Sequence, residues 1–398
     1  MNPLYTTAAL QCVSVERRRG QSAWEVLTPQ DFEHAITEIS SWSGYEPTPF
    51  YSLEDVAQQV GVAEIHYKHE GPRFGLGSFK ALGGAYAALR VLQRQIAGMT
   101  GVEVSLSDIR EGRYRGECEK ITLVSATDGN HGRSLAWGCQ QFGAPCRIYI
   151  HADVSEGRAQ IMRDFGADVI RIKGDYDDSV ALARSEAEKN GWFVVSDTSW
   201  PGYTAPPRDV MSGYGVLTRE TCEALGQAPT HVFLQGGVGG MAASIAAALR
   251  QYWKEQSPRV VIVEPDRAAC LIESARLGQA TAVEIAEETI MAGLSCGEPS
   301  EIAWQILRDE ASDFVTIPDS IVAPTVRLLA RPTGVDVAIE AGESAVAGLA
   351  ALIAISAQPR YADQIGLDQN SRVLLIGSEG VTDPEIFSAI MAGADYAA

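Results

Sequence analysis

RFGLGSFKALGGAYAAL, residues 73–89, surrounds one lysine, Lys80, with small and apolar residues. Glycines at 75, 77, 83 and 84 let the backbone come close to another group. Two interpretations follow. Lys80 is a surface lysine whose ammonium reaches water from a glycine-rich loop, or it is partly desolvated beside a bound group, where it can act as an amine. On this stretch alone the first interpretation is favoured, so the rest of the chain has to decide.

The bulk composition is that of a soluble globular protein. The chain has 398 residues, which suits about two domains. Hydrophobic residues make up 46% and charged residues 21%. The net charge of −19 argues against non-specific binding to nucleic acid or to anionic membranes. We therefore expect no nucleic-acid or membrane partner, although this charge does not identify a substrate.

The seven cysteines are scattered along the chain. Because neither a CxxC pair nor a Cys/His cluster is present, we expect no metal and a reducing compartment. Cys270 and Cys296 both lie near glycine- and proline-rich loops, and a bridge between them is left open. The N-terminal stretch lacks the pattern of a signal peptide, and no apolar run is long enough to cross a bilayer. We therefore expect a cytoplasmic protein.

Strand patterns alternate with helical patterns from residue 121 onward. The predicted strands are 121–127, 146–151, 168–174, 192–197, 231–236, 259–265 and 373–380. The predicted helices are 131–143, 155–166 with Ser155 as N-cap, 179–191 and 241–255. This alternation, with apolar strands, predicts a parallel sheet that helices bury on both faces. The proline- and glycine-rich stretch 200–209 is the best single candidate for a domain boundary.

A second glycine-rich stretch, FLQGGVGGMAAS at 233–244, follows a predicted strand and opens a predicted helix. Gly237, Gly239 and Ala242 match the GxGxxA fingerprint of dinucleotide sites, and the next strand ends in Glu264. The physics shared by such sites is that exposed N–H groups and a helix N-terminus bind a phosphate. We therefore predict a phosphate site. A dinucleotide site, as in an NAD-dependent oxidoreductase, is the alternative, and a tight turn without a ligand is disfavoured.

Three further polar stretches follow predicted strands, at the sheet edge where ligands bind in α/β proteins. They are SATDGNHGRS (125–134), SDTSWPGY (196–203) and GSEGVTDP (377–384). Each carries carboxylate, amide or hydroxyl groups. A dinucleotide-binding oxidoreductase gives no role to any of these stretches, nor to Lys80.

These motifs, in this order, resemble the pyridoxal-phosphate (PLP) enzymes of the tryptophan-synthase-β fold type (fold type II), and within them the diaminopropionate ammonia-lyases. The fold type rests on SFK, GNHG and the late glycine loop, and the narrower family on Asp128 and MAGLSCGEP. The other stretches that carry the resemblance are TDGNHGRS, SDTSWPGYT, MSGYG, VEP, GES (342–344) and EGVTDP. Departures at Gly77-Ser78, Gly236, Gly240 and 331–341 leave fine substrate preference open.

The resemblance implies an α/β fold with two open, twisted, mostly parallel sheets flanked by helices. The active site is expected between a larger and a smaller domain. The larger, PLP-binding domain would be discontinuous, 1–88 and 218–398, and the smaller α/β domain would be 89–217. The resemblance also implies a homodimer that acts on a small amino-acid substrate.

The resemblance assigns the cofactor PLP to particular residues. Lys80 would form the Schiff base with PLP, Asn130 would bond the ring O3′, and the hydroxyl of Thr382, or else of Ser378, would meet the ring nitrogen. A neutral hydroxyl leaves that nitrogen largely unprotonated, which is enough of an electron sink for elimination. The remaining expected cofactor contacts, including the 5′-phosphate loop, are Phe79, Gly236, Gly237, Val238, Gly239, Gly240 and Met241.

Related hydroxy-amino-acid dehydratases carry Ser-x-Gly/Ala-Asn-His where this chain has TDGNH, residues 127–131, so a carboxylate, Asp128, projects into the substrate space here. A carboxylate there suits a substrate with a second, positively charged amine, because a buried cation needs a partner. We therefore expect Lys80, Asp128 and Asp197 to be catalytic, the two carboxylates holding the ammonium and moving protons. The other role open to Asp128 is to cap the helix that begins at His131. Further expected substrate contacts are Thr127, Ser78 and Tyr203.

The implied reaction is α,β-elimination of ammonia from D- and L-2,3-diaminopropionate, giving pyruvate and two ammonia. Lys80 and Asp128 on opposite faces of Cα would let one site accept both enantiomers. One alternative is a PLP-dependent serine/threonine-type dehydratase or another β-eliminating lyase, which Asp128 discriminates. The other is the NAD-dependent oxidoreductase. A PLP-fold binding protein without activity is disfavoured by the presence of Lys80.

Overall fold

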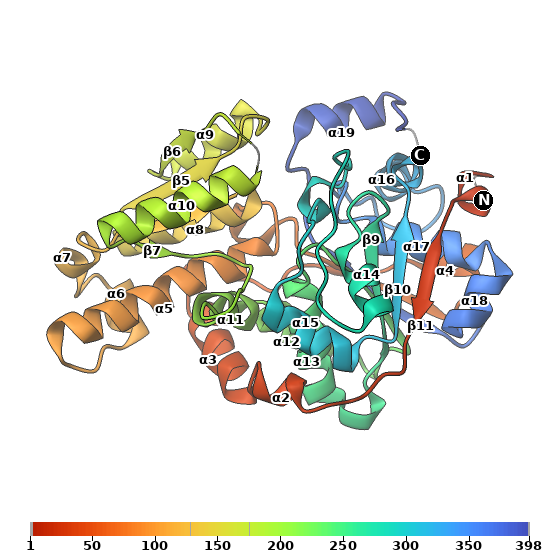
Figure 1. Ribbon diagram of the computed structural model, residues 1–398. Coiled ribbons are helices and arrows are strands. Elements are labelled where there is room, and N and C mark those ends of the chain that lie inside the picture. Colours follow the sequence, from red (N-terminus) through yellow and green to blue (C-terminus); the bar gives the residue numbers. More distant parts are fainter. Residues whose placement is uncertain (1–2, 128, 175, 397–398) are drawn as a thin grey trace. The chain divides into compact units, whose positions relative to one another are not determined.

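The computed structural model describes residues 3–127, 129–174 and 176–396. Its contacts divide the chain into two compact units, each with its own sheet (Figure 1). Unit 1 consists of Met1–Pro29, Pro47–Ser78 and Leu217–Ala398, and unit 2 of Gln30–Glu46 and Phe79–Val216. The domain boundaries expected from the sequence stay a prediction.

The described part of unit 1 contains a seven-stranded sheet in the order β1-β10-β9-β8-β11-β3-β2. The central strands pair in parallel, whereas β1 and β2 pair antiparallel at the two edges. The sequence had predicted β8, β9 and β11, but not β3, β10 or the antiparallel edges β1 and β2. The strands are β1 Gln11–Ser14, β2 Phe50–Ser52, β3 Glu64–His69, β8 His231–Gln235, β9 Arg259–Pro265, β10 Asp313–Ile317 and β11 Arg372–Gly377.

The core of unit 1 centres on α17 (Ala347–Ser356), which contacts β8, β9, β10 and β11. Its residues through Ile355 are all buried, as expected for a helix that is apolar on every side. The other helices are α1 Pro3–Thr7, α2 Ser22–Glu25, α4 Glu54–Val60, α12 Gly215–Ala224 (which begins in unit 2), α13 Gly240–Trp253, α14 Cys270–Leu277, α15 Glu301–Glu310, α16 Val322–Ala330, α18 Pro359–Ile365 and α19 Pro384–Met391. Short 3₁₀ turns lie at Arg73–Gly75, Lys254–Gln256, Ala292–Leu294 and Asp319–Ile321.

In the described part of unit 2 a four-stranded sheet has the order β6-β5-β4-β7. All of its pairings are parallel, which confirms the sequence prediction for this region. Each of its strands had been predicted, although the observed strands are shorter. They are β4 Leu123–Ala126, β5 Cys146–Ile150, β6 Asp168–Arg171 and β7 Phe193–Val194.

Two helices of unit 2, α5 (Lys80–Thr100) and α8 (Asn130–Phe142), pack closely because small residues face each other. A Cβ on Gly138 would lie 2.8 Å from Cα of Ala85, and one on Gly84 would lie 2.7 Å from Oγ of Ser134. The small residues that follow Lys80 therefore serve helix packing. The other helices are α3 Pro29–Ser40, α6 Leu106–Arg110, α7 Arg115–Cys118, α9 Glu156–Asp164, α10 Tyr176–Asn190 and α11 Ala205–Gly213.

The start of α9 confirms the cap that the sequence predicted. Oγ of Ser155 accepts the N–H of Arg158 at 3.4 Å, one turn into the helix. Among the residues that the structure describes, none of the helices combines the length and the apolar composition that a bilayer crossing requires.

Candidate active site

Lys80 lies at the beginning of a helix in unit 2. It is the first residue of α5, and its Nζ donates a hydrogen bond to Oδ2 of Asp197, just beyond the carboxyl end of β7. The two side chains are only 21% and 17% exposed. The interpretation of Lys80 as an ordinary surface lysine is therefore wrong, and its ammonium is partly desolvated beside a carboxylate.

Asp197 is kept ionised by its neighbours. Burial raises its pKa, but the ammonium of Lys80 and the ring of His131 outweigh burial and hold the pKa of Asp197 well below its ordinary value. His131, in α8, donates from Nε2 to the carbonyl oxygen of Val195 at 2.9 Å. Its Nδ1 is buried and has no hydrogen-bond partner among the described residues. The ring thus has one nitrogen anchored and one available to a polar ligand group.

Two aromatic rings lie beside the lysine. Nζ of Lys80 is 5.4 Å from the ring centroid of Phe79, which in turn packs against Tyr214 with centroids 4.8 Å apart. Burial raises the pKa of the Tyr214 hydroxyl, although the charge of Lys80 lowers it, so the phenol stays neutral. Sequence reasoning missed Tyr214, whose only signal was the MSGYG stretch. Gly83 makes room for this ring, since a Cβ there would lie 2.6 Å from Cε1 of Tyr214.

The loop between β4 and α8 holds three predicted residues. Oγ1 of Thr127 accepts the N–H of Gly129 at 3.1 Å and that of Gly132 at 3.4 Å, so Thr127 binds the N-cap residue and the first turn of α8. Asn130, expected to bond the cofactor, is the first residue of the helix. Asp128 lies outside the residues that the structure describes, and its roles stay predictions.

The hydroxyl of Tyr203, expected to contact substrate, is engaged by the backbone. It donates to the carbonyl of Val194 at 2.8 Å and accepts the N–H of Ser196 at 3.0 Å. Its ring stacks on Trp200, with centroids 3.9 Å apart. Tyr203 thus fastens the loop that carries Asp197, and its contact with substrate stays a prediction.

In unit 1 the second glycine-rich stretch turns tightly from β8 into α13. Gly237 and Gly239 have φ angles of +59° and +93°, a conformation that favours glycine. α13 begins at Gly240 with Gly239 as its N-cap. The first N–H groups of an α-helix lack intrahelical acceptors and form the positive end of its dipole. Residues 236–241, which include Val238 and Met241, thus form a loop suited to a phosphate.

The dinucleotide alternative needs the carboxylate of Glu264 to bind a ribose hydroxyl, but this carboxylate already accepts hydrogen bonds from the backbone. The residue is fully buried, and its two carboxylate oxygens accept the N–H groups of Leu271 and Ile272, both at 2.8 Å. Burial raises the pKa of Glu264 to about 8, against these two hydrogen bonds. Since both oxygens cap the start of α14, Glu264 is not placed to hold a ribose hydroxyl.

The glycine loop is braced by neighbouring loops of unit 1. A Cβ on Gly237 would lie 3.4 Å from the carbonyl oxygen of Gly293. The N–H of Gly293 donates to Oγ of Ser344 at 3.2 Å, and the N–H of Ser344 donates to Glu379 at 3.3 Å. The MAGLSCGEP and GES stretches therefore connect the glycine loop to the loop after β11. Cys270 and Cys296 both lie near Gly237, and all seven cysteines, which lie within the described ranges, are free thiols.

The loop after β11 presents two buried hydroxyl residues, Ser378 and Thr382. Oγ1 of Thr382 donates to Oε2 of Glu379 at 3.4 Å. Ser78, an expected substrate contact, forms a bridge with Glu379, and the N–H of Gly380 donates to the carbonyl of Gly77 at 2.9 Å. The structure thus brings Gly77 and Ser78 beside the loop that carries Ser378 and Thr382.

The residues around Lys80, and those of the glycine loop and of the loop after β11, have the chemistry that PLP requires. An aldehyde needs an amine, which the partly desolvated Lys80 supplies. A phosphate monoester needs converging N–H groups, which the turn at Gly237 and Gly239 and the start of α13 supply. A pyridine nitrogen needs a polar partner, which Ser378 or Thr382 can supply.

The chain is similar to known proteins over most of its length. Residues 42–379 match the model of the family described as pyridoxal-phosphate dependent enzyme. The chain is 38% identical over 355 residues to the diaminopropionate ammonia-lyase of Escherichia coli strain K12, covering 88% of each protein.

Two solved structures of that Escherichia coli enzyme have the same fold. The holo form matches with a TM-score of 0.86 and 35% identity, covering 96% of each chain. The complex with an aminoacrylate-PLP azomethine reaction intermediate matches with a TM-score of 0.85 and 34% identity, covering 96% of this chain and 97% of the other. These matches confirm the predicted fold. The chain belongs to the pyridoxal-phosphate-dependent enzymes of fold type II, and within them to the diaminopropionate ammonia-lyase family.

Proposed function

We propose that this protein is a PLP-dependent carbon–nitrogen lyase that eliminates ammonia from 2,3-diaminopropionate, giving pyruvate and two ammonia. The observation that carries the proposal is the Lys80–Asp197 pair, in a chain that is 38% identical to a diaminopropionate ammonia-lyase. It places an amine and an ionised carboxylate together, and the elimination needs both a base at Cα and proton transfer at Cβ.

PLP, when bound, supplies an electron sink for the negative charge that develops at Cα. Lys80 attaches the cofactor through its amine, and 236–241 hold its phosphate through backbone N–H groups. Phe79 and Asn130 contact the ring, and Thr382 or Ser378 supplies the hydroxyl at its nitrogen. These assignments are supported by the resemblance of the motifs and by the free N–H groups expected at the start of α13.

Lys80 and Asp128 serve as the bases at Cα. The amine of Lys80, once released by the incoming substrate, takes the Cα proton from one face, and the Asp128 carboxylate takes it from the other. A site with a base on each face accepts both D- and L-diaminopropionate. The Asp197 carboxylate is hydrogen-bonded to Lys80 and its pKa is held low, so it stays ionised and orients the amine. It also stabilises the ammonium that forms when Lys80 takes up the Cα proton.

The second amine of the substrate explains the number of carboxylates. Ammonia leaves far more readily as a protonated amine, and a buried ammonium needs a negative partner. Asp128 holds this ammonium, with Thr127, Ser78 and Tyr203 as further substrate contacts. A serine-type dehydratase, whose leaving group is a hydroxyl, has no such requirement.

The assembly and the location are also proposals. We propose that the protein is a homodimer in the cytoplasm, in line with the scattered cysteines and the acidic composition. Its larger, PLP-binding domain would comprise 1–88 and 218–398, and its smaller domain 89–217.

A substrate panel tests this function directly. The purified, PLP-loaded protein is supplied with the two enantiomers of diaminopropionate, serine and threonine and with hydroxyaspartate, and keto-acid and ammonia are both measured. Diaminopropionate should give two ammonia for each pyruvate at the highest kcat/KM. Serine can give only one ammonia for each pyruvate, so a higher kcat/KM on serine would make the protein a dehydratase.

A further inference from the structure

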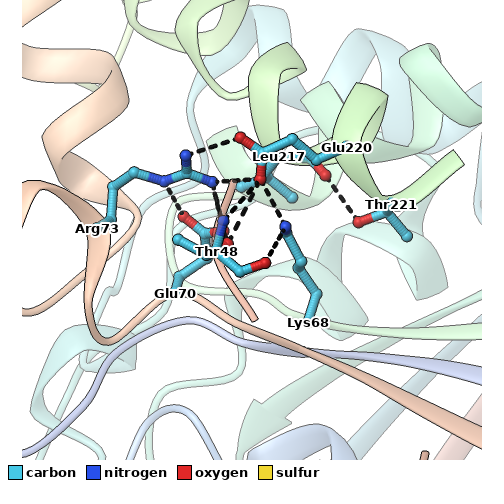
Figure 2. A network of polar contacts seen from close by, with 7 residues as sticks. All are labelled: Thr48, Lys68, Glu70, Arg73, Leu217, Glu220 and Thr221. Carbon is cyan, nitrogen blue, oxygen red and sulfur yellow. Dashed lines mark hydrogen bonds and ion pairs between the residues drawn. The ribbon is translucent and has the colours of Figure 1, made fainter. Parts of the chain in front are cut away.

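The side chain of Arg73, at the beginning of the stretch that leads to Lys80, is almost fully buried between two carboxylates of unit 1 (Figure 2). Nε and one terminal nitrogen donate to the two oxygens of Glu70, at 2.9 and 2.8 Å. The two terminal nitrogens donate to the two oxygens of Glu220, in α12, both at 2.8 Å. Two bidentate contacts thus hold the guanidinium of Arg73 in one orientation.

Lys68 and Thr48 complete the cluster, which we call the Arg73 cluster (Thr48, Lys68, Glu70, Arg73 and Glu220). Nζ of Lys68 donates to the carbonyl of Thr48 at 2.8 Å and to Oε2 of Glu220 at 2.5 Å. Arg73 donates to the hydroxyl of Thr48 at 3.1 Å. Two positive and two negative charges lie together, so the cluster is neutral as a whole.

The electrostatics keep these charges in place. Burial lowers the pKa of Arg73, but Glu70 and Glu220 outweigh burial and raise it above its ordinary value. Burial raises the pKa of Glu220, but the hydrogen bonds from Arg73 and Lys68 hold it below its ordinary value. Arg73 and Glu220 are therefore held in their charged forms by their partners in the cluster.

A buried ion cluster of this kind is a poor source of stability. Removing charges from water costs several kcal/mol for each ion, and well-packed apolar residues often replace such clusters without loss. What an arginine fork offers instead is direction, because its donors match two carboxylates in a fixed plane. The role of the cluster is therefore to be sought in geometry.

The cluster joins the places where the chain enters and leaves unit 1. Thr48 follows Pro47, where the chain enters the unit, and Glu220 lies just after Leu217, where it enters again. Arg73 precedes Ser78, the last residue before the chain leaves for Lys80. The Arg73 cluster thus ties the residues before Lys80 to the beginning of the segment 47–78 and to the beginning of the segment 217–398.

The loop between Arg73 and Ser78 has a backbone that needs such support. Phe74 has a φ of +50°, in the left-handed region that side chains rarely adopt, and Gly75 and Gly77 have φ of +70° and +82°. Backbone hydrogen bonds join this region to β11 and the loop after it: the N–H of Glu70, before the loop, donates to Gly377 at the end of β11 at 2.8 Å, and the N–H of Gly380 donates to Gly77 at 2.9 Å. The side chain of Arg73 adds a further anchor at the start of the strained part.

We propose that Arg73, held by Glu70 and Glu220, is a positioning residue that fixes the loop leading to Ser78 and Lys80. The inference rests on the proposed function in one respect only, namely that Lys80 is the amine that attaches the cofactor. When the grip is lost, the loop relaxes and the amine spends less time where it captures the cofactor and takes up the Cα proton. Misplacement of a reacting group by about 1 Å can slow a reaction roughly 100-fold.

The test compares Arg73 with a second buried arginine of unit 1. Arg17 is also paired with a buried carboxylate, Glu310, at 2.7 Å, and it lies far from the Lys80 loop in sequence. Arg73→Lys and Arg17→Lys both keep the charge and lose the fork. If one of them fails to fold, the pairs Arg73→Met with Glu70→Gln and Arg17→Met with Glu310→Gln leave no uncompensated charge.

Three measurements separate positioning from stability. The midpoint temperature of thermal unfolding should fall by similar amounts in the Arg73 and the Arg17 variants. In the PLP-free protein, hydrogen exchange of peptide 70–80 should rise only in the Arg73 variants. In the PLP-loaded protein, kcat should fall roughly 10- to 100-fold for Arg73→Lys, with KM within about threefold, and stay near wild type for Arg17→Lys.

The outcomes discriminate between the two proposals. Unchanged exchange in peptide 70–80, or an equal loss of kcat at Arg17, would show that the Arg73 cluster only stabilises the fold. If the wild-type protein does not act on diaminopropionate, the proposed function fails. The exchange measurement and the rate at which borohydride traps added PLP on Lys80 still test the role of Arg73.

Discussion

Nζ of Lys80 donates a hydrogen bond to the carboxylate of Asp197, a residue 117 positions further along the chain. The pair joins the first residue of α5 to the loop after β7, within one unit. It keeps the lysine charged and gives it a fixed direction in the protein alone. It also places an ionised carboxylate beside the amine, which has to lose its proton before it can react.

Replacing Lys80 by alanine should abolish the visible absorbance of bound PLP and the lyase activity together. The reason is that no other amine would attach the cofactor or serve as base, so activity should fall by at least about 100-fold. Lys189→Ala is the control, because the side chain of Lys189 is 72% exposed. A Lys80→Ala protein that keeps both the absorbance and the activity would contradict the assignment of Lys80 as the amine that attaches PLP.

Asp197→Asn should destabilise the PLP-free protein at neutral pH by about 1 kcal/mol, since a partly buried ion pair is lost. The pKa of Asp197 is lower in the folded protein than its ordinary value of 3.8. Its ionisation therefore stabilises the fold above about pH 4, and this contribution is lost as the pH falls through the folded pKa.

The measurement is thermal unfolding from pH 8 to pH 3. The difference in unfolding temperature between wild type and Asp197→Asn should be constant down to about pH 4 and should become smaller below it. Asp168→Asn, which removes a surface pair with Arg147, should change stability little at any pH. A gap that widens in acid would contradict the direction of the pKa shift.

Gly239→Asp should weaken PLP binding by roughly tenfold or more, because it adds a negative charge to the phosphate loop. Its Cβ would also lie 3.1 Å from Leu307 and 3.3 Å from Ala303, which would displace the loop. The matched control is Gly278→Asp. Both glycines have positive φ, +93° and +71°, so both variants carry backbone strain, but a Cβ on Gly278 meets no atom within 4 Å. Titration with PLP is followed by absorbance, beside thermal unfolding. Equal PLP affinity in the two variants would place the phosphate elsewhere.

Local sequence patterns were enough to predict the parts of the fold that repeat. Apolar runs such as VVIV in β9 and the strand–helix alternation of unit 2 predicted parallel sheets, because buried strands have to be apolar on both faces. The edge strands β1 and β2 escaped prediction. They are short and half-exposed, and their antiparallel pairing depends on partners far along the chain.

The candidate site was only partly predictable, for the same physical reason. Lys80 and the glycine loop stand out, since they combine rare residue types with strand and helix ends. The Arg73–Glu220 pair spans 147 positions, and nothing local marks either residue. Tyr203 has a role that the sequence did not reveal, because its hydroxyl fastens the loop through two backbone groups.

Asp128 should decide the substrate class, and Asp128→Ser tests it by imitating the dehydratase loop. Folding should survive, because Thr127 already accepts an N–H of the first turn of α8 and serine itself caps helices well. The change removes the partner of the second ammonium and one candidate base. Losing a charged contact whose partner stays buried costs about 2–5 kcal/mol.

The kcat/KM on diaminopropionate should therefore fall by orders of magnitude, and more for the enantiomer whose Cα proton faces Asp128. The kcat/KM on L-serine should fall far less, or rise, because serine has no second ammonium. The measurement compares D- and L-diaminopropionate and L-serine in both proteins, with thermal unfolding as the control for folding. An equal loss on all three substrates would mean that Asp128 supports the loop rather than the substrate. The protein would then be a general β-eliminating lyase, with substrate selection residing in other residues.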